Sequence, residues 1–299
     1  MTTINRKIVT HNGSFHSDDI FACATLSILF DKRGETFELA RTRDEEIIKN
    51  ADYVFDVGGI YDPATNRFDH HQIGGAGKRD SSIEYSSFGL VWKHFGVEIT
   101  ESEEIFRMID KRLAAPIDAH DNGMDLVEKK YDVSPYIIQD LFISMRPTWR
   151  ESYVDVDQKF LECVAIAKKI LLREIVCAKD FIIAEESVIT IYKNTEDKRI
   201  IVLDKDYPYG EALSNFPEPC FVVYPKESDN TWGARTVRVD NKSFKSKKYF
   251  PTNWAGLRDE EFAKISGVED AVFCHRALFL AVAKSREGAI KLAQIALVS

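Results

Sequence analysis

The first sixty residues alternate between short strand-like runs and helical segments, and this alternation constrains the fold more than any other feature. The segments Arg6–Thr10, Thr36–Ala40 and Tyr53–Val57 are predicted as strands, and Asp19–Phe30 and Arg43–Asn50 as helices. Strands that alternate with helices are typical of a parallel sheet with crossover helices. In such sheets ligands bind beyond the carboxyl ends of the strands. We therefore expect an α/β fold with a site at that edge.

Downstream segments extend the alternation and predict where the first domain ends. Ile60–Phe68, with Asp-Pro in its middle, resembles a short hairpin. Helices are predicted over Ser86–Phe95, Glu101–Ala115 and Gln158–Ala178, and the last is long and amphipathic enough to link two domains. We therefore predict an N-terminal domain over residues 1–178, with a mainly parallel sheet flanked by helices and with the linker helix included.

From about residue 181 the pattern changes to short runs typical of strands, broken by proline and glycine. These runs are Val188–Tyr192, Ile200–Leu203, Cys220–Tyr224 and Gly233–Val239, and a final helix is expected over Ser285–Leu297. A chain of 299 residues is long enough for two domains with cores of their own. The mixture predicts a smaller α+β domain over residues 181–299.

Composition argues against several classes of protein. A net charge of −8 disfavours a protein that coats duplex nucleic acid non-specifically, although a small or single-stranded substrate stays compatible with it. No stretch approaches the roughly 18 apolar residues of a membrane span, so no membrane partner is expected. The five cysteines contain no C-x-x-C motif, which indicates reduced thiols. No apolar leader precedes the first strand, and we expect a cytoplasmic protein.

Four of the seven histidines fall within the first 71 residues, and carboxylates accompany them. The cluster consists of His11, His16, Asp18, Asp56, Asp69, His70 and His71. A lone histidine near a strand end is most often a surface or hydrogen-bonded residue, and Asp19 is well placed to cap a helix. Taken together, however, the set offers nitrogen and oxygen donors without thiolate, which suits Mn²⁺, Mg²⁺, Fe or Zn²⁺. Several imidazoles disfavour Mg²⁺ alone, so we expect Mn²⁺.

A site for two such cations would make the protein a hydrolase of phosphate esters. Two cations about 3.5–4 Å apart clamp the oxygens of a phosphoryl centre and lower the pKa of water from about 15.7 toward about 7. The resulting hydroxide is a nucleophile at neutral pH, and no side chain has to attack the phosphorus. The sequence therefore predicts a two-metal phosphoesterase.

Several motifs resemble those of a known family. Asp69-His70-His71 matches the signature triplet of the DHH phosphoesterase superfamily, which includes exonucleases and manganese-dependent pyrophosphatases. Longer matches are similar to the melanocyte-proliferating-gene family of DHH-like proteins, and they cover nearly the whole chain. These matches are Thr10–Asp19, Asp56–Asp62, Phe68–Gln72, Ser86–Gly89, Ile117–Gly123, Trp232–Val237, Phe250-Pro251 and Trp254–Arg258.

The resemblance implies a two-domain α/β phosphoesterase whose smaller C-terminal domain closes over substrate. It also implies a role for each residue of the cluster: His11 and His16 bind one cation, Asp18 binds the other, Asp56 bridges both, His70 is a further ligand, His71 faces the substrate phosphate and Asp69 orients an imidazole. The superfamily usually has aspartate where His16 stands. The first metal position is therefore richer in nitrogen here, which leaves the identity of the metal and the class of substrate open.

The last carboxylate ligand has two candidates in the sequence. Asp118 or Asp121 could supply it, and Asn122-Gly123 after them is a turn signal. Asp118 is slightly favoured because it ends the apolar stretch Ala114–Ile117. A turn or capping role for Asp121 is as plausible as ligation.

Positive charge for a phosphate substrate is expected in the C-terminal domain, where arginine can contact two phosphate oxygens at once. The candidates are Arg235, Arg238, His275 and Arg276. Arg235 and Arg238 would point to opposite faces of a strand, so at most one of them would reach the cleft. His275 and Arg276, which follow an apolar run, are the better placed pair.

Three functions fit these features. The favoured one is a metal-dependent phosphodiesterase that acts as an exonuclease on RNA or oligonucleotides, and the resemblance suggests RNA and 3′-to-5′ polarity. A small-molecule phosphohydrolase acting on pyrophosphate or a nucleotide suits the net charge of −8 somewhat better. A metal-binding regulatory protein without turnover would have a broken ligand set, whereas every expected position carries a competent residue. The sequence leaves the oligomeric state open.

Overall fold

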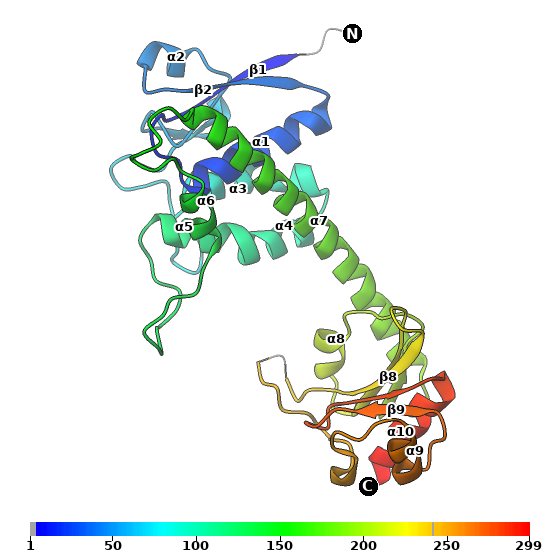
Figure 1. Ribbon diagram of the computed structural model, residues 1–299. Coiled ribbons are helices and arrows are strands. Elements are labelled where there is room, and N and C mark those ends of the chain that lie inside the picture. The colour runs from blue at the N-terminus through cyan, green and yellow to red at the C-terminus, as the bar shows by residue number, and fades with distance from the viewer. Residues whose placement is uncertain (1–3, 241) are drawn as a thin grey trace. The chain divides into compact units, whose positions relative to one another are not determined.

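The chain divides into two compact units, described here from a computed structural model of residues 4–240 and 242–299 (Figure 1). The first unit ends at Lys179, and the second is formed by Asp180–Ser299. The boundary lies within one long helix, α7 (Val156–Asn194). Each unit contains a five-stranded sheet with helices beside it, and this confirms the predicted α/β class.

The sheet of the first unit is mainly parallel, with strand order β2-β1-β3-β5-β4. Only the hairpin β4–β5 pairs in antiparallel fashion, which confirms the hairpin predicted between Ile60 and Phe68. β3 is two residues shorter than predicted, because Asp56 takes a left-handed backbone conformation with φ 55° and ends the strand. The strands are β1 (Asn5–Thr10), β2 (Thr36–Arg41), β3 (Tyr53–Phe55), β4 (Tyr61–Asp62) and β5 (Arg67–Phe68).

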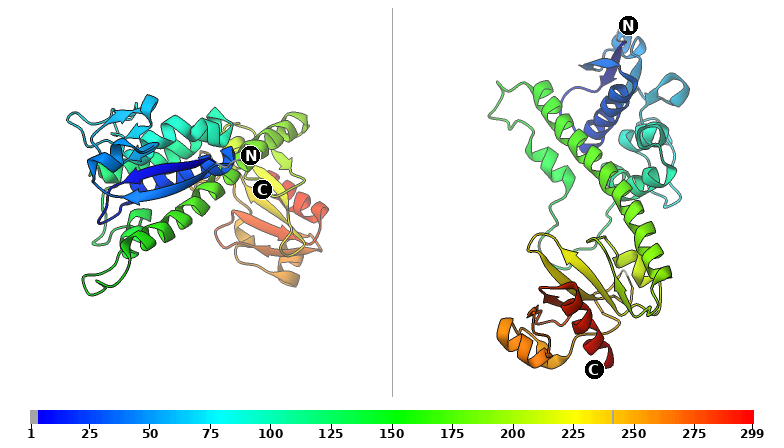
Figure 2. Two further views of the ribbon diagram at one scale, coloured as in Figure 1. Left: turned by 90° about the horizontal axis from the view of Figure 1, so that it is seen from above. Right: turned by 90° about the vertical axis from the view of Figure 1, so that its right-hand side faces the viewer.

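Helix α1 (Ser17–Arg33) is the centre of the first unit. All of its residues from Ser17 to Phe30 are buried, and it packs against α3 (Ser87–Thr100). The right-hand view of Figure 2 shows α1 between α7 and α3. Because a helix covered on several sides cannot present a polar face to water, its apolar residues run all round it. The same burial places the first turn of α1, with Asp18 and Asp19, inside the protein.

The helical run before residue 122 is longer than predicted. The sequence predicted one helix over Glu101–Ala115, whereas helical backbone continues to Asp121 through a π-helical segment. A π segment is a single wide turn that often marks a functional site. Asp118 and Asp121 therefore both lie on a helix. The remaining helices of the unit are α2 (Glu45–Lys49), a short 3₁₀ turn (Pro63–Thr65), α4 (Glu103–Ile109), the π segment (Asp110–Ala114), α5 (Ala115–Asp121) and α6 (Ile138–Ser144).

The sheet of the second unit has strand order β6-β7-β8-β10-β9, in which only β6 and β7 are parallel. Side chains of β7 alternate between two cores, as the period of a strand requires. Phe221 and Val223 pack with Trp254 and α10, and Val222 and Tyr224 pack with the end of α7. The elements are β6 (Ile200–Val202), α8 (Gly210–Ser214), β7 (Phe221–Lys226), β8 (Thr231–Thr236), a 3₁₀ turn (Thr252–Trp254), α9 (Asp259–Ser266), β9 (Ala271–Cys274), β10 (Leu280–Ala283) and α10 (Arg286–Val298).

The strand predicted over Val188–Tyr192 is wrong, because these residues form the last turns of α7. The segment is rich in β-branched side chains, which favour strands locally. Ala184, Val188 and Tyr192 are nevertheless spaced four residues apart and all three are buried. In a helix that spacing puts them on one face, and Val188 and Tyr192 there cover one side of the sheet. Burial of this face outweighs the local preference for a strand.

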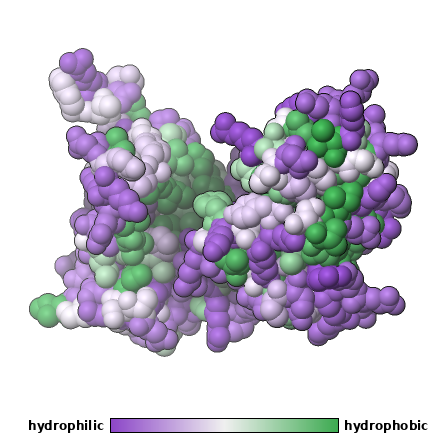
Figure 3. Space-filling view, turned by 90° about the horizontal axis from the view of Figure 1, so that it is seen from below, coloured by the Kyte–Doolittle hydropathy of each residue, from purple (hydrophilic) through white to green (hydrophobic). Residues whose placement is uncertain are grey.

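On the face drawn in Figure 3, hydrophilic side chains predominate and hydrophobic ones form scattered patches. Among residues 4–240 and 242–299, no helix combines the length and the apolar character needed to cross a membrane.

Candidate metal centre

Two neighbouring parallel strands deliver the first pair of site residues. His11 follows β1 and Asp56 follows β3, so both side chains lie at the carboxyl edge of the sheet. The Nδ1–H of His11 donates to the carbonyl oxygen of Asn12 at 2.9 Å, which leaves Nε2 to face Asp56 Oδ2 at 3.1 Å. The left-handed backbone at Asp56 aims its carboxylate into the site, a conformation that aspartate tolerates better than most residues. A hydrogen bond from Ser87 Oγ at 3.1 Å holds Asp56 Oδ1.

The start of α1 supplies His16, Asp18 and Asp19. His16 precedes the helix, and its backbone N–H donates to Asp19 Oδ1 at 2.8 Å, which is the capping role expected for Asp19. Asp19 also reaches the site, because its Oδ2 lies 3.3 Å from His11 Nε2. Burial would lower the pKa of His11, but hydrogen bonds to Asp19 and Asp56 outweigh burial and raise that pKa to about 10.

The triplet Asp69-His70-His71 follows β5, the neighbour of β3. His70 Nε2 lies 3.3 Å from both Asp56 Oδ1 and Asp121 Oδ2. Asp69 accepts hydrogen bonds from His71 Nδ1 at 2.7 Å and from the Gly59 backbone N–H at 2.6 Å. It thus connects His71 to the loop after β3. The His71 side chain is 62% exposed, and within residues 4–240 and 242–299 its other ring nitrogen has no hydrogen-bond partner.

Asp118 and Asp121 have different surroundings. Asp121 faces His70 and, with His16 and Asp18, forms one of the groups whose ligand atoms all lie within 4.8 Å of one another. Asp118 is buried away from these groups. It pairs with Arg79 and accepts hydrogen bonds from Ser86 Oγ at 2.5 Å and the Gly89 N–H at 3.0 Å. The geometry therefore favours Asp121 over Asp118, the residue that the sequence slightly favoured, as the last carboxylate ligand.

The donor set fits divalent cations. Both carboxylate oxygens of Asp18 are buried, and neither has a hydrogen-bond partner among the described residues. Burial, and then the charges of Asp56 and Asp121, raise the pKa of Asp18 well above its usual range. Burial likewise raises the pKa of Asp19 and of Asp121. Carboxylates this close together need positive charge among them. Three groups in the described chain have metal-binding spacing: Asp56/Asp69/His70/His71, His11/His16/Asp56 and His16/Asp18/Asp121.

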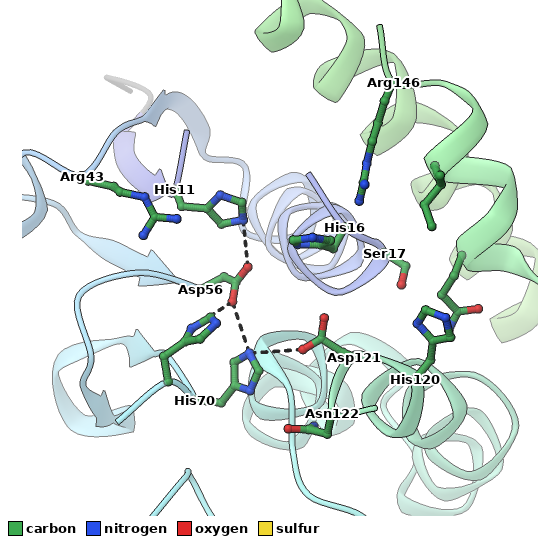
Figure 4. A pocket seen from close by; sticks show the side chains of 13 residues that line it. His11, His16, Ser17, Arg43, Asp56, His70, His120, Asp121, Asn122 and Arg146 are labelled. Atoms are coloured by element: carbon green, nitrogen blue, oxygen red, sulfur yellow. Dashed lines mark ion pairs between the residues drawn. The ribbon is translucent and has the colours of Figure 1, made fainter. Parts of the chain in front are cut away.

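Six of these side chains line a cavity of about 550 Å³ in the first unit, namely His11, His16, Asp56, His70, His71 and Asp121 (Figure 4). Its wall includes residues that the sequence analysis did not single out as site residues: Arg43, His120, Gln139 and Arg146. Arg43 follows the carboxyl end of β2, so the rule that located His11 and Asp56 would also have found it. Arg146 follows α6 and has no comparable signal in the sequence. Within residues 4–240 and 242–299, neither guanidinium has an ion-pair partner at 4.0 Å or less.

The basic residues expected to bind substrate belong to the second unit. Arg235 and Arg238 line one cavity of about 470 Å³ there, together with Tyr209 and Tyr224. The prediction that the two arginines point to opposite faces of one strand does not apply, because β8 ends at Thr236, before Arg238. His275 Nδ1 accepts the Ala277 N–H at 3.0 Å and so stabilises a turn, and Arg276 beside it is exposed. Substrate binding by these four residues stays a prediction.

Comparison with known proteins gives one consistent family. Residues 7–297 match the model of the MYG1 exonuclease family, described as "Uncharacterised protein family (UPF0160)". The chain is 29% identical to the protein named MYG1 exonuclease of Homo sapiens, over 97% of this chain and 85% of that protein. It is 28% identical to the MYG1 protein of Dictyostelium discoideum and 30% identical to that of Chlamydia pneumoniae, with 94% of each relative covered. The chain belongs to the MYG1 family.

Proposed function

We propose that this chain is a metal-dependent phosphodiesterase that degrades RNA or oligonucleotides from the 3′ end. The observation that carries the proposal is the pair of buried Asp18 oxygens, which have no hydrogen-bond partner among the described residues, within a cluster of histidines and carboxylates. The human, bovine, rat and mouse relatives are named exonucleases, which supports the reaction class. The 3′-to-5′ polarity rests on the family resemblance.

We infer that the cluster holds two divalent cations, with Mn²⁺ as the preferred metal. His11, His16 and Asp56 would bind one cation, and Asp18, Asp56, His70 and Asp121 the other. Asp56 belongs to two of the groups with metal-binding spacing, as a bridging ligand requires, and its two oxygens face different histidines. When bound, such cations acidify water and neutralise charge on a phosphoryl group.

The other residues of the cavity would hold the phosphate. The hydrogen bond to Asp69 is the main reason why the pKa of His71 is raised, so Asp69 favours a protonated, outward-facing His71 that can donate to a phosphate oxygen. Arg43 and Arg146 place two further positive charges on the cavity wall, and arginine suits phosphate oxygens. His71, Arg43 and Arg146 would orient the phosphodiester for attack.

A small-molecule phosphohydrolase is the competing function, because the net charge of −8 suits a compact anion better than a long polyanion. The reaction products distinguish the exonuclease from the small-molecule phosphohydrolase. Metal-stripped protein is incubated with a 5′-labelled single-stranded RNA, or with pyrophosphate, after addition of Mn²⁺, of Mg²⁺ or of no metal. The exonuclease proposal predicts a Mn²⁺-dependent ladder of 5′-labelled fragments that shorten one nucleotide at a time.

Two variants test whether the cluster is responsible. Asp56→Asn should abolish the ladder, and Asp125→Asn, which changes an exposed carboxylate outside the cavity, should leave it intact. Phosphate release from pyrophosphate without RNA cleavage would reassign the protein to the small-molecule class. Metal binding with no turnover of either substrate would support a non-catalytic role.

A further inference from the structure

The segment between α6 and α7 carries two aromatic side chains that are almost fully exposed to solvent. Trp149 is 84% exposed and Tyr153 is 83% exposed. The Arg150 guanidinium lies over the Trp149 ring, 4.7 Å from its centroid. Large exposed aromatic groups on one short segment are uncommon in a soluble protein and often mark a binding surface.

Local hydrogen bonds hold this segment in a fixed shape. The Thr148 N–H donates to Glu151 Oε2 at 2.8 Å, and the Glu151 N–H donates back to the Thr148 carbonyl oxygen at 3.0 Å. A second turn follows, in which the Val154 N–H donates to the Glu151 carbonyl oxygen at 3.0 Å. The two bonds between Thr148 and Glu151 bracket Trp149, and the second turn encloses Tyr153. The exposed ring is thus presented by an ordered turn.

The same segment enters the metal cavity at Arg146. Figure 4 shows the Arg146 side chain pointing to the region of His16. Its Nε is buried and has no hydrogen-bond partner in the described part of the chain. A buried guanidinium nitrogen without a partner is costly, and an anion is its natural ligand. Arg146 therefore points to an anionic group bound beside the metal ligands.

We propose that Arg146 and Trp149 form a nucleotide subsite that guides a single strand to the metal centre, a proposal that rests on the exonuclease function. Arg146 binds a backbone phosphate, and Trp149, backed by Arg150, stacks on a base. Arg146 and Trp149 are three residues apart, which spans at most about 11 Å of backbone. The Trp149 ring and the Arg146 guanidinium can therefore contact neighbouring nucleotides of one nucleic-acid strand. Stacking needs an unpaired base face, which selects single strands over duplexes. The acidic net charge disfavours duplex binding as well.

Binding and turnover of RNA test the subsite separately. The Mn²⁺-loaded full chain is titrated against a labelled single-stranded phosphorothioate RNA that resists hydrolysis, and cleavage of ordinary RNA is measured in parallel. Trp149→Ala should weaken binding about 10-fold or more and raise KM by a similar factor, with kcat changed less than about twofold. Trp149→Phe keeps an aromatic face and should recover most of the affinity. Arg146→Ala should weaken binding and reduce its salt dependence.

Tyr131→Ala is the matched control, because Tyr131 is also an aromatic residue of the first unit, is 80% exposed and does not line the metal cavity. It should leave RNA binding unchanged, and wild-type affinity in Trp149→Ala would overturn the subsite. So would a changed oligomeric state of Trp149→Ala with unchanged RNA binding, which would identify the ring as a protein interface. Wild-type RNA binding that depends on Trp149, without any cleavage, would retain the subsite and reject the exonuclease function.

Discussion

Asp118 and Asp121 show how two identical side chains on one short helix acquire different tasks. Asp121 faces His70, whereas Asp118 joins Arg79 to the start of α3 through Ser86 and Gly89. The next residue, Ser87, holds Asp56. Asp118 thus supports the cluster from outside it, and of the two only Asp121 belongs to a group with metal-binding spacing.

The two aspartates should respond differently to substitution. Asp118→Ala leaves Arg79 with Asp110 as its one carboxylate partner and removes the acceptor of Ser86 and Gly89, so we expect it to lower the free energy of unfolding by about 1–3 kcal/mol in urea titrations. Asp121→Asn should abolish turnover and reduce the metal content. It should also stabilise the metal-free protein at neutral pH, because burial raises the pKa of Asp121 and its charged form therefore opposes folding. Normal metal content in Asp121→Asn would return Asp118 to consideration.

Asp69 offers a test through pH. Its hydrogen bond is the largest cause of the raised pKa of His71, and burial of the ring acts in the opposite direction. Asp69→Asn should lower that pKa, so the loss of activity on the alkaline side of the pH profile should begin at a lower pH. We expect turnover to fall about 10- to 100-fold, as for other residues that orient a site from behind. An unshifted alkaline limb would show that protonated His71 has no part in the reaction.

At single positions, the sequence could locate the cluster but could not complete it. His11, Asp56 and Asp69–His71 were predictable, because each follows a recognisable strand whose end lies at one edge of the sheet. The choice between Asp118 and Asp121 depends on the directions of their side chains on α5. The predicted helix ended at Ala115, before either residue. Arg146 was out of reach, because only the packing of α6 brings it to the cavity.

Among the elements, the start of α3 is the most tightly constrained. A Cβ added at Gly89 would overlap the Asp118 carboxylate, so only glycine fits beside it. Gly89→Ala should lower the free energy of unfolding by about 1–3 kcal/mol. It should also lower activity, since Ser87 at the start of the same helix holds Asp56. Gly210→Ala is the control, because no atom lies within 4 Å of an added Cβ there and the helix gains alanine. It should be neutral or slightly stabilising in the same urea titration.

The elements also show where local pattern and tertiary packing disagree. Most strands and helices were predictable because their apolar spacing matches the core they face. The run Val188–Tyr192 satisfies two periods at once, with β-branched residues that suit a strand and a four-residue repeat that suits a helix. The helix forms because its Val188–Tyr192 face packs against the sheet, and the sequence pattern does not show this contact. The π segment before α5 is likewise invisible in the sequence, since it depends on how the helical run packs.

At the scale of the whole molecule, the proposed cations act on one unit alone. All residues of the three candidate metal groups lie before Lys179, and residues 180–299 form a compact unit with two hydrophobic clusters of their own.

Because a ligand stabilises only the folded state that binds it, cations at 100 to 1,000 times their Kd should add about 2.7–4.1 kcal/mol to the stability of the first unit. Chelation should therefore speed amide hydrogen exchange in α1 by about 100- to 1,000-fold and leave β7 and β8 unchanged. Hydrogen exchange followed by peptide mass spectrometry measures both regions in one sample, and α7 is left out because it passes through both units. Equal acceleration in α1 and β8 would contradict independent units, and no acceleration in α1 would contradict metal binding at the cluster.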